Sequence, residues 1–164
     1  MPKAAREKAD ISAVYSNYAD MLFRIAYSIT LSMDDAQDAV HEVFVAYLGK
    51  LPDFRDAEHE KAWFVRATIN KCRDHLRRRK VRSYTPLQEV AEIPAESIES
   101  RDAFKEVLKL PEKYKIVILL HYFEGYGISE ISSALSISSS AVKMRLARGR
   151  EMLRFALEGD KADI

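Results

Sequence analysis

The chain has 164 residues, 48% of them hydrophobic and 31% charged, a composition that predicts one or two folded domains and excludes a wholly disordered chain. No apolar run approaches the roughly 20 residues of a membrane-spanning helix, and the charged N-terminus leads into no apolar segment typical of a secretory signal. One cysteine excludes an internal disulfide framework, while five glycines and five prolines favour helices over many strands. We therefore expect a helical, cytoplasmic protein.

The formal net charge of +1 hides a segregation of charge along the chain. Residues 62–82 contain eight basic residues and one acid, residues 83–100 contain four acids and no base, and residues 138–154 contain five basic residues and one acid. Two basic blocks separated by an acidic stretch predict two separate contacts with a polyanion. Ordinary solvated helix faces are the alternative interpretation of either block alone.

Two segments at the start of the chain have the spacing of amphipathic helices. Apolar residues at three- and four-residue steps predict the first helix over residues 11–30. Ser32 and Asp35 resemble a capping box and predict the start of a second helix, which ends before Pro52. We expect the buried stripe of this second helix to contain Ala36, Val40, Val43, Phe44, Tyr47, Leu48 and Leu51.

A polar connector is predicted over residues 53–60, with the Phe54 ring exposed, and a third helix follows it. The buried face of this helix should contain Ala62, Val65, Ile69, Cys72 and Leu76. Its opposite face contains Arg66, Asn70, Arg73 and Arg77. Cys72 and His75 have helical spacing, but no further metal ligands stand at sensible spacing, so we interpret Cys72 as a core residue and predict no metal.

The C-terminal half carries the pattern of a helix-turn-helix. Residues 128–135 form a helix-sized segment with Gly127 as its N-cap, Ser136 and Ile137 make a turn, and Ser138 caps a helix over residues 139–157. The second helix is basic outside and aliphatic inside, as a helix that enters the major groove of DNA must be. A generic helical hairpin is the alternative.

Both halves resemble bacterial sigma factors of the sigma-70 family, most closely the short extracytoplasmic-function group. The resemblance to region 4 of that family lies in residues 110–114, 130–131, 135–138 and 142–150. The resemblance to region 2 lies in residues 35–44, 63–66 and 74–77, with Phe54 and Asn70. It implies an all-α fold of two small helical domains, a region 2 bundle over residues 11–81 and a region 4 helix-turn-helix over residues 102–158, joined by a flexible acidic linker over residues 82–101.

By this resemblance, one face of the second helix docks on the coiled coil of the β′ clamp of core RNA polymerase. The implied docking residues are Asp35, Asp38, His41, Glu42 and Phe44. The residues implied to hold the melted minus-ten strand are Phe54, Arg55, Lys61, Trp63, Arg66, Asn70, Arg73 and Arg77. For Trp63 the alternative to a DNA contact is a position in the protein core. The residues implied to contact the minus-thirty-five element are Ser139, Ser140, Lys143, Met144, Arg145 and Arg148.

The chain departs from the family pattern at four of these or neighbouring positions. His41 stands where glutamine is usual, Ser132 where a packed alanine is usual, Ser136 where the turn glycine is usual, and Ala141 where threonine is common. A serine in a left-handed turn conformation costs about 1 kcal/mol. Alanine at the start of the last helix removes one expected phosphate contact.

The sequence thus predicts a sigma factor that directs promoter-specific initiation, with core polymerase (β′ clamp and β flap) and promoter DNA as partners. Many family members also bind an anti-sigma factor. No Gly-rich phosphate loop or nucleophile motif is present, so we expect no catalysis, cofactor or small-molecule substrate, and a monomer when free. The alternatives are a stand-alone helix-turn-helix regulator that recruits no polymerase, and an interaction module that only sequesters an anti-sigma partner. A nuclease would need clustered metal ligands.

Overall fold

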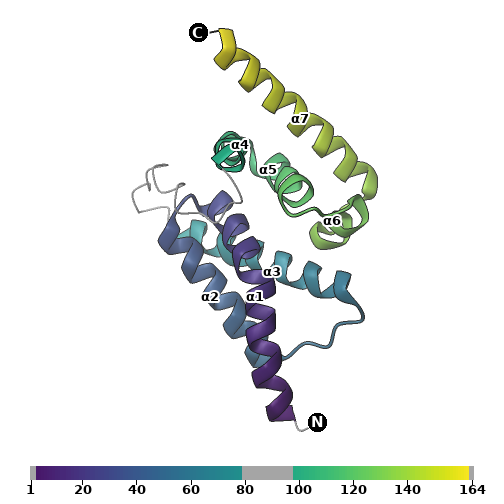
Figure 1. The fold of residues 1–164 in the computed structure, drawn as a ribbon. Coiled ribbons are helices and arrows are strands. Elements are labelled where there is room, and N and C mark those ends of the chain that lie inside the picture. Colours follow the sequence, from purple (N-terminus) through teal and green to yellow (C-terminus); the bar gives the residue numbers. More distant parts are fainter. Residues whose placement is uncertain (1–2, 79–97, 163–164) are drawn as a thin grey trace. The chain divides into compact units, whose positions relative to one another are not determined.

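The computed structural model describes residues 3–78 and 98–162, and every regular element in these stretches is a helix (Figure 1). The all-α class is therefore confirmed for this part of the chain. The chain divides into two compact units, Met1–Pro86 and Leu87–Ile164. Most of the predicted linker lies outside the described residues, and its last four positions belong to a helix. None of the described helices is long and apolar enough to cross a membrane.

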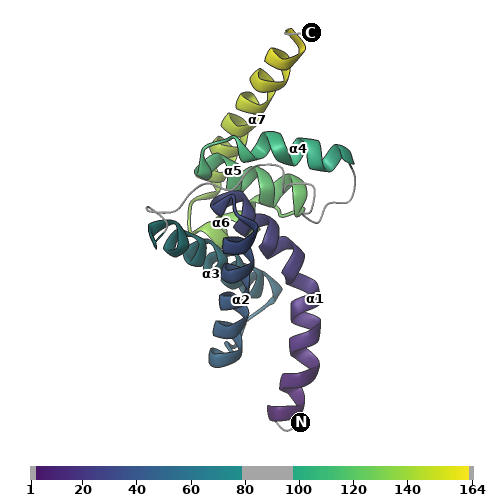
Figure 2. The same ribbon diagram turned by 90° about the vertical axis from the view of Figure 1, so that its left-hand side faces the viewer.

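The first unit is a bundle of three helices, α1 (Lys3–Thr30), α2 (Met33–Lys50) and α3 (Ala57–Arg78). Each packs against the other two, and they lie side by side in both views (Figures 1 and 2). Their shared core is apolar, as burial of the periodic residues requires. Its fully buried members include Leu22, Ile25, Ala26, Tyr27, Ala36, Ala39, Val43, Phe64, Val65 and Cys72.

Phe64 of α3 lies at the centre of an aromatic cluster that joins the three helices. Its ring centroid lies 4.4 Å from that of Tyr18 in a stacked arrangement and 5.0 Å from that of Trp63 in an edge arrangement. The rings of Phe44 and Tyr47 lie 5.8 and 5.3 Å away. Such pairs contribute about 0.5–1.5 kcal/mol each beyond the area that they bury.

Two helix starts in this unit differ from the sequence prediction. Helix α1 begins at Lys3 rather than at residue 11. Helix α3 begins at Ala57, so the predicted connector over residues 53–60 ends four residues early. The reason is a cap, because the Asp56 carboxylate accepts a hydrogen bond from the backbone N–H of His59 at 2.8 Å. Helix α2 follows its predicted cap, in which Ser32 Oγ accepts from the N–H of Asp35 at 3.2 Å.

The second unit contains α4 (Ile98–Leu108), α5 (Glu112–Ile118), a π-helical turn η2 (Leu119–Phe123), α6 (Ile128–Leu135) and α7 (Ser139–Ala162). Helix α7 packs against α4, α5 and α6, so it supplies one wall of the core. It ends five residues beyond the predicted end, and α4 begins four residues before the predicted domain. The core contains Phe104, Val107, Leu108, Ile116, Val117, Ile118, Leu119, Leu120, Ile131, Ala134, Val142 and Leu146.

Helix α7 approaches α5 closely at Gly149. A β-carbon added at this position would lie 2.7 Å from Cγ1 of Ile118 and 3.7 Å from Cβ of Tyr114. Ile118 is only 1% exposed, so its side chain has little room to move. The missing side chain at residue 149 therefore sets the distance between the two helices.

Replacing Gly149 with alanine should lower the free energy of unfolding by about 1–3 kcal/mol, because the added methyl group overpacks the contact with Ile118. Gly49 of α2 provides the matched control, since a β-carbon there meets nothing within 4 Å. Gly49→Ala should raise stability by up to about 1 kcal/mol through helix propensity. Urea and thermal unfolding of the full chain measure both changes, and a Gly149→Ala variant as stable as the parent contradicts the argument.

Candidate nucleic-acid interface

One exposed face of α3 carries the basic and amide side chains that the sequence places together. Arg66, Asn70, Arg73 and Arg77 are all exposed, and the opposite face is buried. From Arg66 to Arg77 this face extends about 17 Å at 1.5 Å per residue, the rise of roughly five stacked bases. The Arg77 guanidinium donates to Asp74 at 2.6 Å, but the pair is exposed and contributes little. The face therefore suits a row of phosphates.

Aromatic rings gather next to the N-terminal end of this face. The ring centroids of Phe54 and Trp63 lie 6.1 Å apart, and both side chains are half-buried, so Phe54 is less exposed than predicted. Trp63 combines a core edge, packed on Phe64 and Tyr47, with a solvent edge. Lys61 is half-buried and Arg55 is exposed beside them. The loop before α3 and the first turns of α3 thus bring together both base-stacking candidates.

His59 is a residue that sequence reasoning missed. Its ring lies edge-on to Phe54, with centroids 5.3 Å apart, and its Nδ1 accepts a hydrogen bond from the backbone N–H of Arg55 at 3.2 Å. It therefore fixes both the ring and the backbone of the loop that carries Phe54. A lone histidine in a polar connector gives no sequence signal for this role, because the contact depends on where the loop turns.

The exposed face of α2 is formed by Asp38, His41, Val45 and Leu48, which we call the α2 face. Val45 is 54% exposed and Leu48 is 42% exposed, so the prediction that Leu48 belongs to the core is wrong. The reason is that an apolar stripe on a helix does not reveal whether it faces the core or solvent. Asp38 and His41 are exposed as well.

The remaining residues predicted to dock on polymerase do not lie fully on the α2 face. Asp35 and Glu42 are half-buried. The Phe44 ring is also half-buried, 5.0 Å from the ring of Tyr15. Its packing toward Phe64 places it on the core side of α2.

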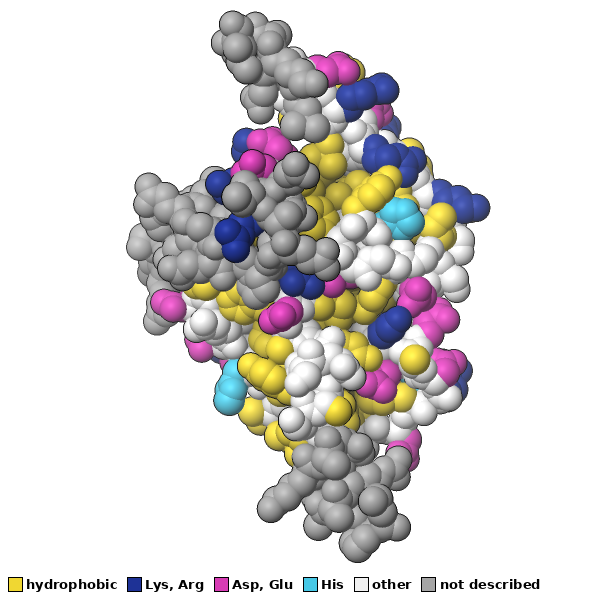
Figure 3. All heavy atoms as spheres, in the orientation of Figure 1, with side chains coloured by type: hydrophobic (Ala, Val, Ile, Leu, Met, Phe, Trp, Pro, Cys, Tyr) yellow, Lys and Arg dark blue, Asp and Glu magenta, His cyan; other side chains and the backbone are white. Residues whose placement is uncertain are grey.

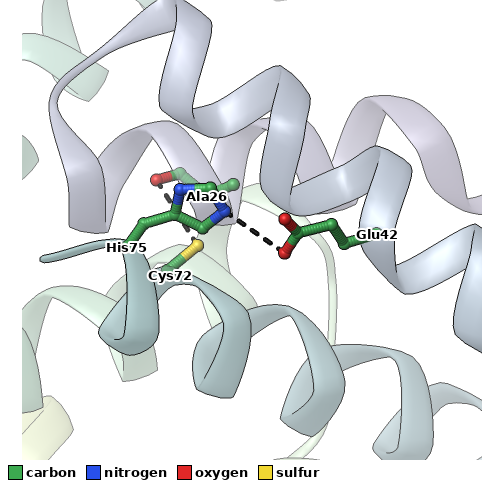
Figure 4. A network of polar contacts seen from close by, with 4 residues as sticks. All are labelled: Ala26, Glu42, Cys72 and His75. Atoms are coloured by element: carbon green, nitrogen blue, oxygen red, sulfur yellow. Dashed lines mark hydrogen bonds and ion pairs between the residues drawn. The ribbon is translucent and has the colours of Figure 1, made fainter. Parts of the chain in front are cut away.

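A polar contact links α2 to α3 near the end of the basic face. Nε2 of His75 lies 3.2 Å from a carboxylate oxygen of Glu42, and Figure 4 shows the His75 ring pointing across the gap toward α2. One turn earlier on α3, the buried Cys72 thiol lies 3.9 Å from the carbonyl oxygen of Ala26, which agrees with the core role predicted for it. Among the described side chains, no three of the types that ligate metals come together.

The helix-turn-helix has the predicted turn. Ser136 has a φ of 56° and a ψ of 44°, the left-handed conformation that glycine usually adopts. The turn is closed by the N–H of Ile137, which donates to the carbonyl oxygen of Ser132 at 3.2 Å. The Ser132 hydroxyl donates in return to the Ile137 carbonyl at 2.6 Å. Ser132 therefore braces the turn that Ser136 strains.

Both helices of the motif have caps that orient them. The backbone N–H of Gly127 donates to the Glu130 carboxylate at 3.2 Å at the start of α6. Ser138 Oγ accepts from the N–H of Ala141 at 3.1 Å at the start of α7. Beyond this cap, α7 buries Val142 and Leu146 and exposes most of the residues predicted to contact DNA. Ser139, Ser140, Lys143, Met144 and Arg148 are exposed, and Arg145 is half-buried.

A groove of about 800 Å³ lies on the second unit between α4, η2 and α7. Its apolar lining includes Val107, Tyr122, Phe123 and Leu153, and its rim carries the basic residues Arg150 and Arg154 and the acidic residues Asp102, Glu106 and Glu158. The Tyr122 hydroxyl accepts a hydrogen bond from Arg150 at 3.1 Å. Figure 3 shows apolar side chains beside basic ones over the α7 part of this face. The groove therefore suits an amphipathic segment rather than a nucleic acid.

Two ionisable groups of the second unit are shifted by burial. Burial lowers the pKa of the Lys115 ammonium group, and the charge of Glu112 opposes this shift. Burial also raises the pKa of the Tyr126 hydroxyl above its usual range, and Glu124 and Glu130 add to the increase. Both groups belong to the core of the unit, so their shifts describe packing and do not point to proton transfer at the candidate surfaces.

Comparison with known proteins assigns both units. The family model "Sigma-70 region 2" matches residues 14–82, and "Sigma-70, region 4" matches residues 105–153. RNA polymerase sigma factor SigZ of Bacillus subtilis is 32% identical over 127 residues, which are 74% of this chain and 72% of SigZ. ECF RNA polymerase sigma factor SigW of the same organism is 28% identical, over 89% of this chain and 86% of its own.

A solved structure supports the same assignment. CnrH, in complex with the cytosolic domain of CnrY, superimposes with a TM-score of 0.71 and 26% identity, covering 93% of this chain and 90% of CnrH. Region 2 and region 4 occur here in order, on helical units that each present a basic face. The chain belongs to the extracytoplasmic-function group of the sigma-70 family, the promoter-specificity factors of RNA polymerase.

Replacing Ser136 with glycine should raise the free energy of unfolding by about 1 kcal/mol, because glycine adopts the left-handed conformation without steric cost. Ser132→Ala, which removes the hydroxyl that braces the turn, should act in the opposite direction by a similar amount. Chemical denaturation of the full chain compares the two variants with the parent. A Ser136→Gly variant that is no more stable than the parent shows that the turn stores no strain.

Proposed function

We propose that this sigma factor uses α3 of its region 2 unit (residues 11–81) to hold the melted minus-ten strand and α7 of its region 4 unit (residues 102–158) to contact the minus-thirty-five element. The observation that carries this proposal is the match of each unit to its own family model, combined with one exposed basic helix face on each. Two separated basic faces suit two separated DNA elements.

The α3 face and the neighbouring rings have the chemistry of a single-strand site. Phosphates run along Arg66, Arg73 and Arg77, while Asn70 supplies an amide for base hydrogen bonds. A base taken out of the stack is held against Phe54 and the solvent edge of Trp63. Each stacked base contributes about 1–3 kcal/mol, which offsets the cost of unpairing and explains opening without a nucleotide cofactor.

The α2 face provides the contact with core polymerase, in our proposal with the coiled coil of the β′ clamp. Val45 and Leu48 are exposed aliphatic side chains one turn apart, and Asp38 and His41 continue the same stripe with polar groups. A short apolar centre beside polar groups is typical of a helix-on-helix interface. Glu42 contributes at its edge, because its side chain is still partly exposed.

The groove of the second unit provides a second contact with polymerase, which we assign to the β flap. Its apolar lining and mixed-charge rim fit an amphipathic helix. A regulatory anti-sigma factor is a further partner in this proposal. The related CnrH has been solved with the cytosolic domain of CnrY, which supports a protein partner of this kind.

We also propose that the free protein is a cytoplasmic monomer that catalyses nothing on its own and needs no cofactor or small-molecule substrate. The polymerase catalyses RNA synthesis, while this chain recognises the promoter and binds the melted strand. Its two DNA-binding units act together only when the polymerase holds them at the spacing of the promoter elements. Binding of the free protein to DNA should therefore be weak.

The test is run-off transcription on fragmented source-genome DNA with bacterial core polymerase that has been stripped of sigma factors. Adding the protein should produce discrete start sites that share two upstream elements. Lys143→Ala and Arg148→Ala should reduce initiation because each removes a positive charge from the exposed face of α7. Duplex binding without initiation supports the stand-alone regulator instead, and neither binding nor initiation supports the interaction module.

Replacing Val45 with aspartate should weaken binding to core polymerase by at least tenfold, because it places a charge at the apolar centre of the α2 face. Folding should be unchanged, since the side chain is already exposed. Asn70→Ala is the matched variant on the α3 face, and it should leave polymerase affinity intact while reducing promoter opening. Fluorescence anisotropy measures affinity and permanganate footprinting measures opening. Normal affinity of the Val45→Asp variant places the docking surface elsewhere.

A further inference from the structure

The centre of the exposed face of α7, near the start of the helix, is occupied by an apolar side chain, Met144. Val142 and Leu146 are buried, and at about 100° per residue the direction opposite to them passes through Met144, with Ser140 about one turn before it and Glu151 two turns after it. Met144 is 62% exposed, although a methionine is usually a buried residue. When α7 lies in a groove, its most outward side chain goes deepest toward the base edges.

Basic side chains flank Met144 on the exposed face of α7. Lys143 precedes Met144 on one side of the helix, Arg148 lies one turn later on the other side, and both are exposed. Their long stems suit the phosphates that border the groove on its two sides. Lys143 and Arg148 therefore supply the electrostatic attraction to DNA, and Met144 is the side chain placed to discriminate between bases.

The chemistry of Met144 restricts what it can recognise. Its thioether sulfur is a weak acceptor and donates no hydrogen bond, so it cannot match the polar pattern of a base edge. The apolar group that base pairs present in the major groove is the C5-methyl group of thymine. Ala147, about one turn later and about 60° around the helix axis from Met144, adds only a methyl group and so leaves room for the base edge to approach Met144.

We propose that Met144 is a specificity-determining residue that packs against the C5-methyl group of a thymine in the minus-thirty-five element. This inference rests on the proposed function, since it requires α7 to enter the major groove of that element. The recognised chemical group is the methyl carbon, and the polar edge of the same base pair remains available to Arg145 or to water.

The experiment removes that methyl group without changing base pairing. In a promoter identified by run-off transcription, each thymine of the upstream element on either strand is replaced singly by deoxyuridine, and the affinity of the holoenzyme is measured by competition. One position should lose about fourfold in affinity, the factor for burying one methyl group. In the Met144→Ala holoenzyme the same replacement should have no effect, and Met144→Leu should restore the sensitivity.

Lys143→Ala is the matched control, because it removes a neighbouring exposed side chain of opposite chemistry. It should weaken binding to all templates and keep the fourfold sensitivity to deoxyuridine. Initiation by a holoenzyme that is insensitive to every deoxyuridine overturns the inference and leaves the proposed function intact. Sensitivity that persists in Met144→Ala overturns the assignment to Met144. Absence of initiation on every template overturns the proposed function itself.

Discussion

The packing of Phe64 fixes the geometry on which the first unit depends. Its buried ring contacts aromatic residues of α1, α2 and α3, so the three helices have one arrangement in which all these rings fit. Trp63, the next residue back, is thereby directed toward the edge of the core, where one side of its ring meets solvent. In the proposed base-stacking site, Trp63 is thus positioned by the core of the bundle, while the loop that carries Phe54 is held by His59. This preorganisation would limit the entropy lost when a strand binds.

The second unit is organised around α7, which forms part of the core and carries the proposed DNA-contacting face. Its inner face is held close to α5 at Gly149, and its start is set by the turn in which Ser136 is strained and Ser132 supports it. Because α6 and α7 are fixed to one another by this turn, the outward residues of α7 have a defined direction. A serine at the left-handed position costs stability, and the hydroxyl of Ser132 recovers part of that cost within the same turn.

The sequence could predict those features that depend on local signals. The bounds of α6 and the start of α7 follow from Gly127, Ser136 and Ser138, each of which acts within four residues of itself. The sequence prediction places the start of α3 too late because residues 53–60 are mostly polar and show no apolar periodicity, and the cap at Asp56 is evident only in the folded loop. The prediction for Leu48 is wrong because apolar periodicity identifies one face of a helix, but it does not show whether another part of the protein packs against that face. The role of His59 depends on a loop contact that no spacing rule describes. The individual DNA and polymerase contacts remain predictions.

The contact between Glu42 and His75 joins α2, the helix proposed to dock on polymerase, to α3, the helix proposed to bind the melted strand. If the Glu42 carboxylate contacts core polymerase instead of His75, the hydrogen bond between α2 and α3 is lost. The C-terminal part of α3 is then held less tightly against α2. Linkage then requires that the effect be mutual. If polymerase binding raises the affinity for the melted strand through this pair, strand binding raises the affinity for polymerase by the same factor. Release of the factor after initiation and loss of the melted strand would then be two views of a single coupling.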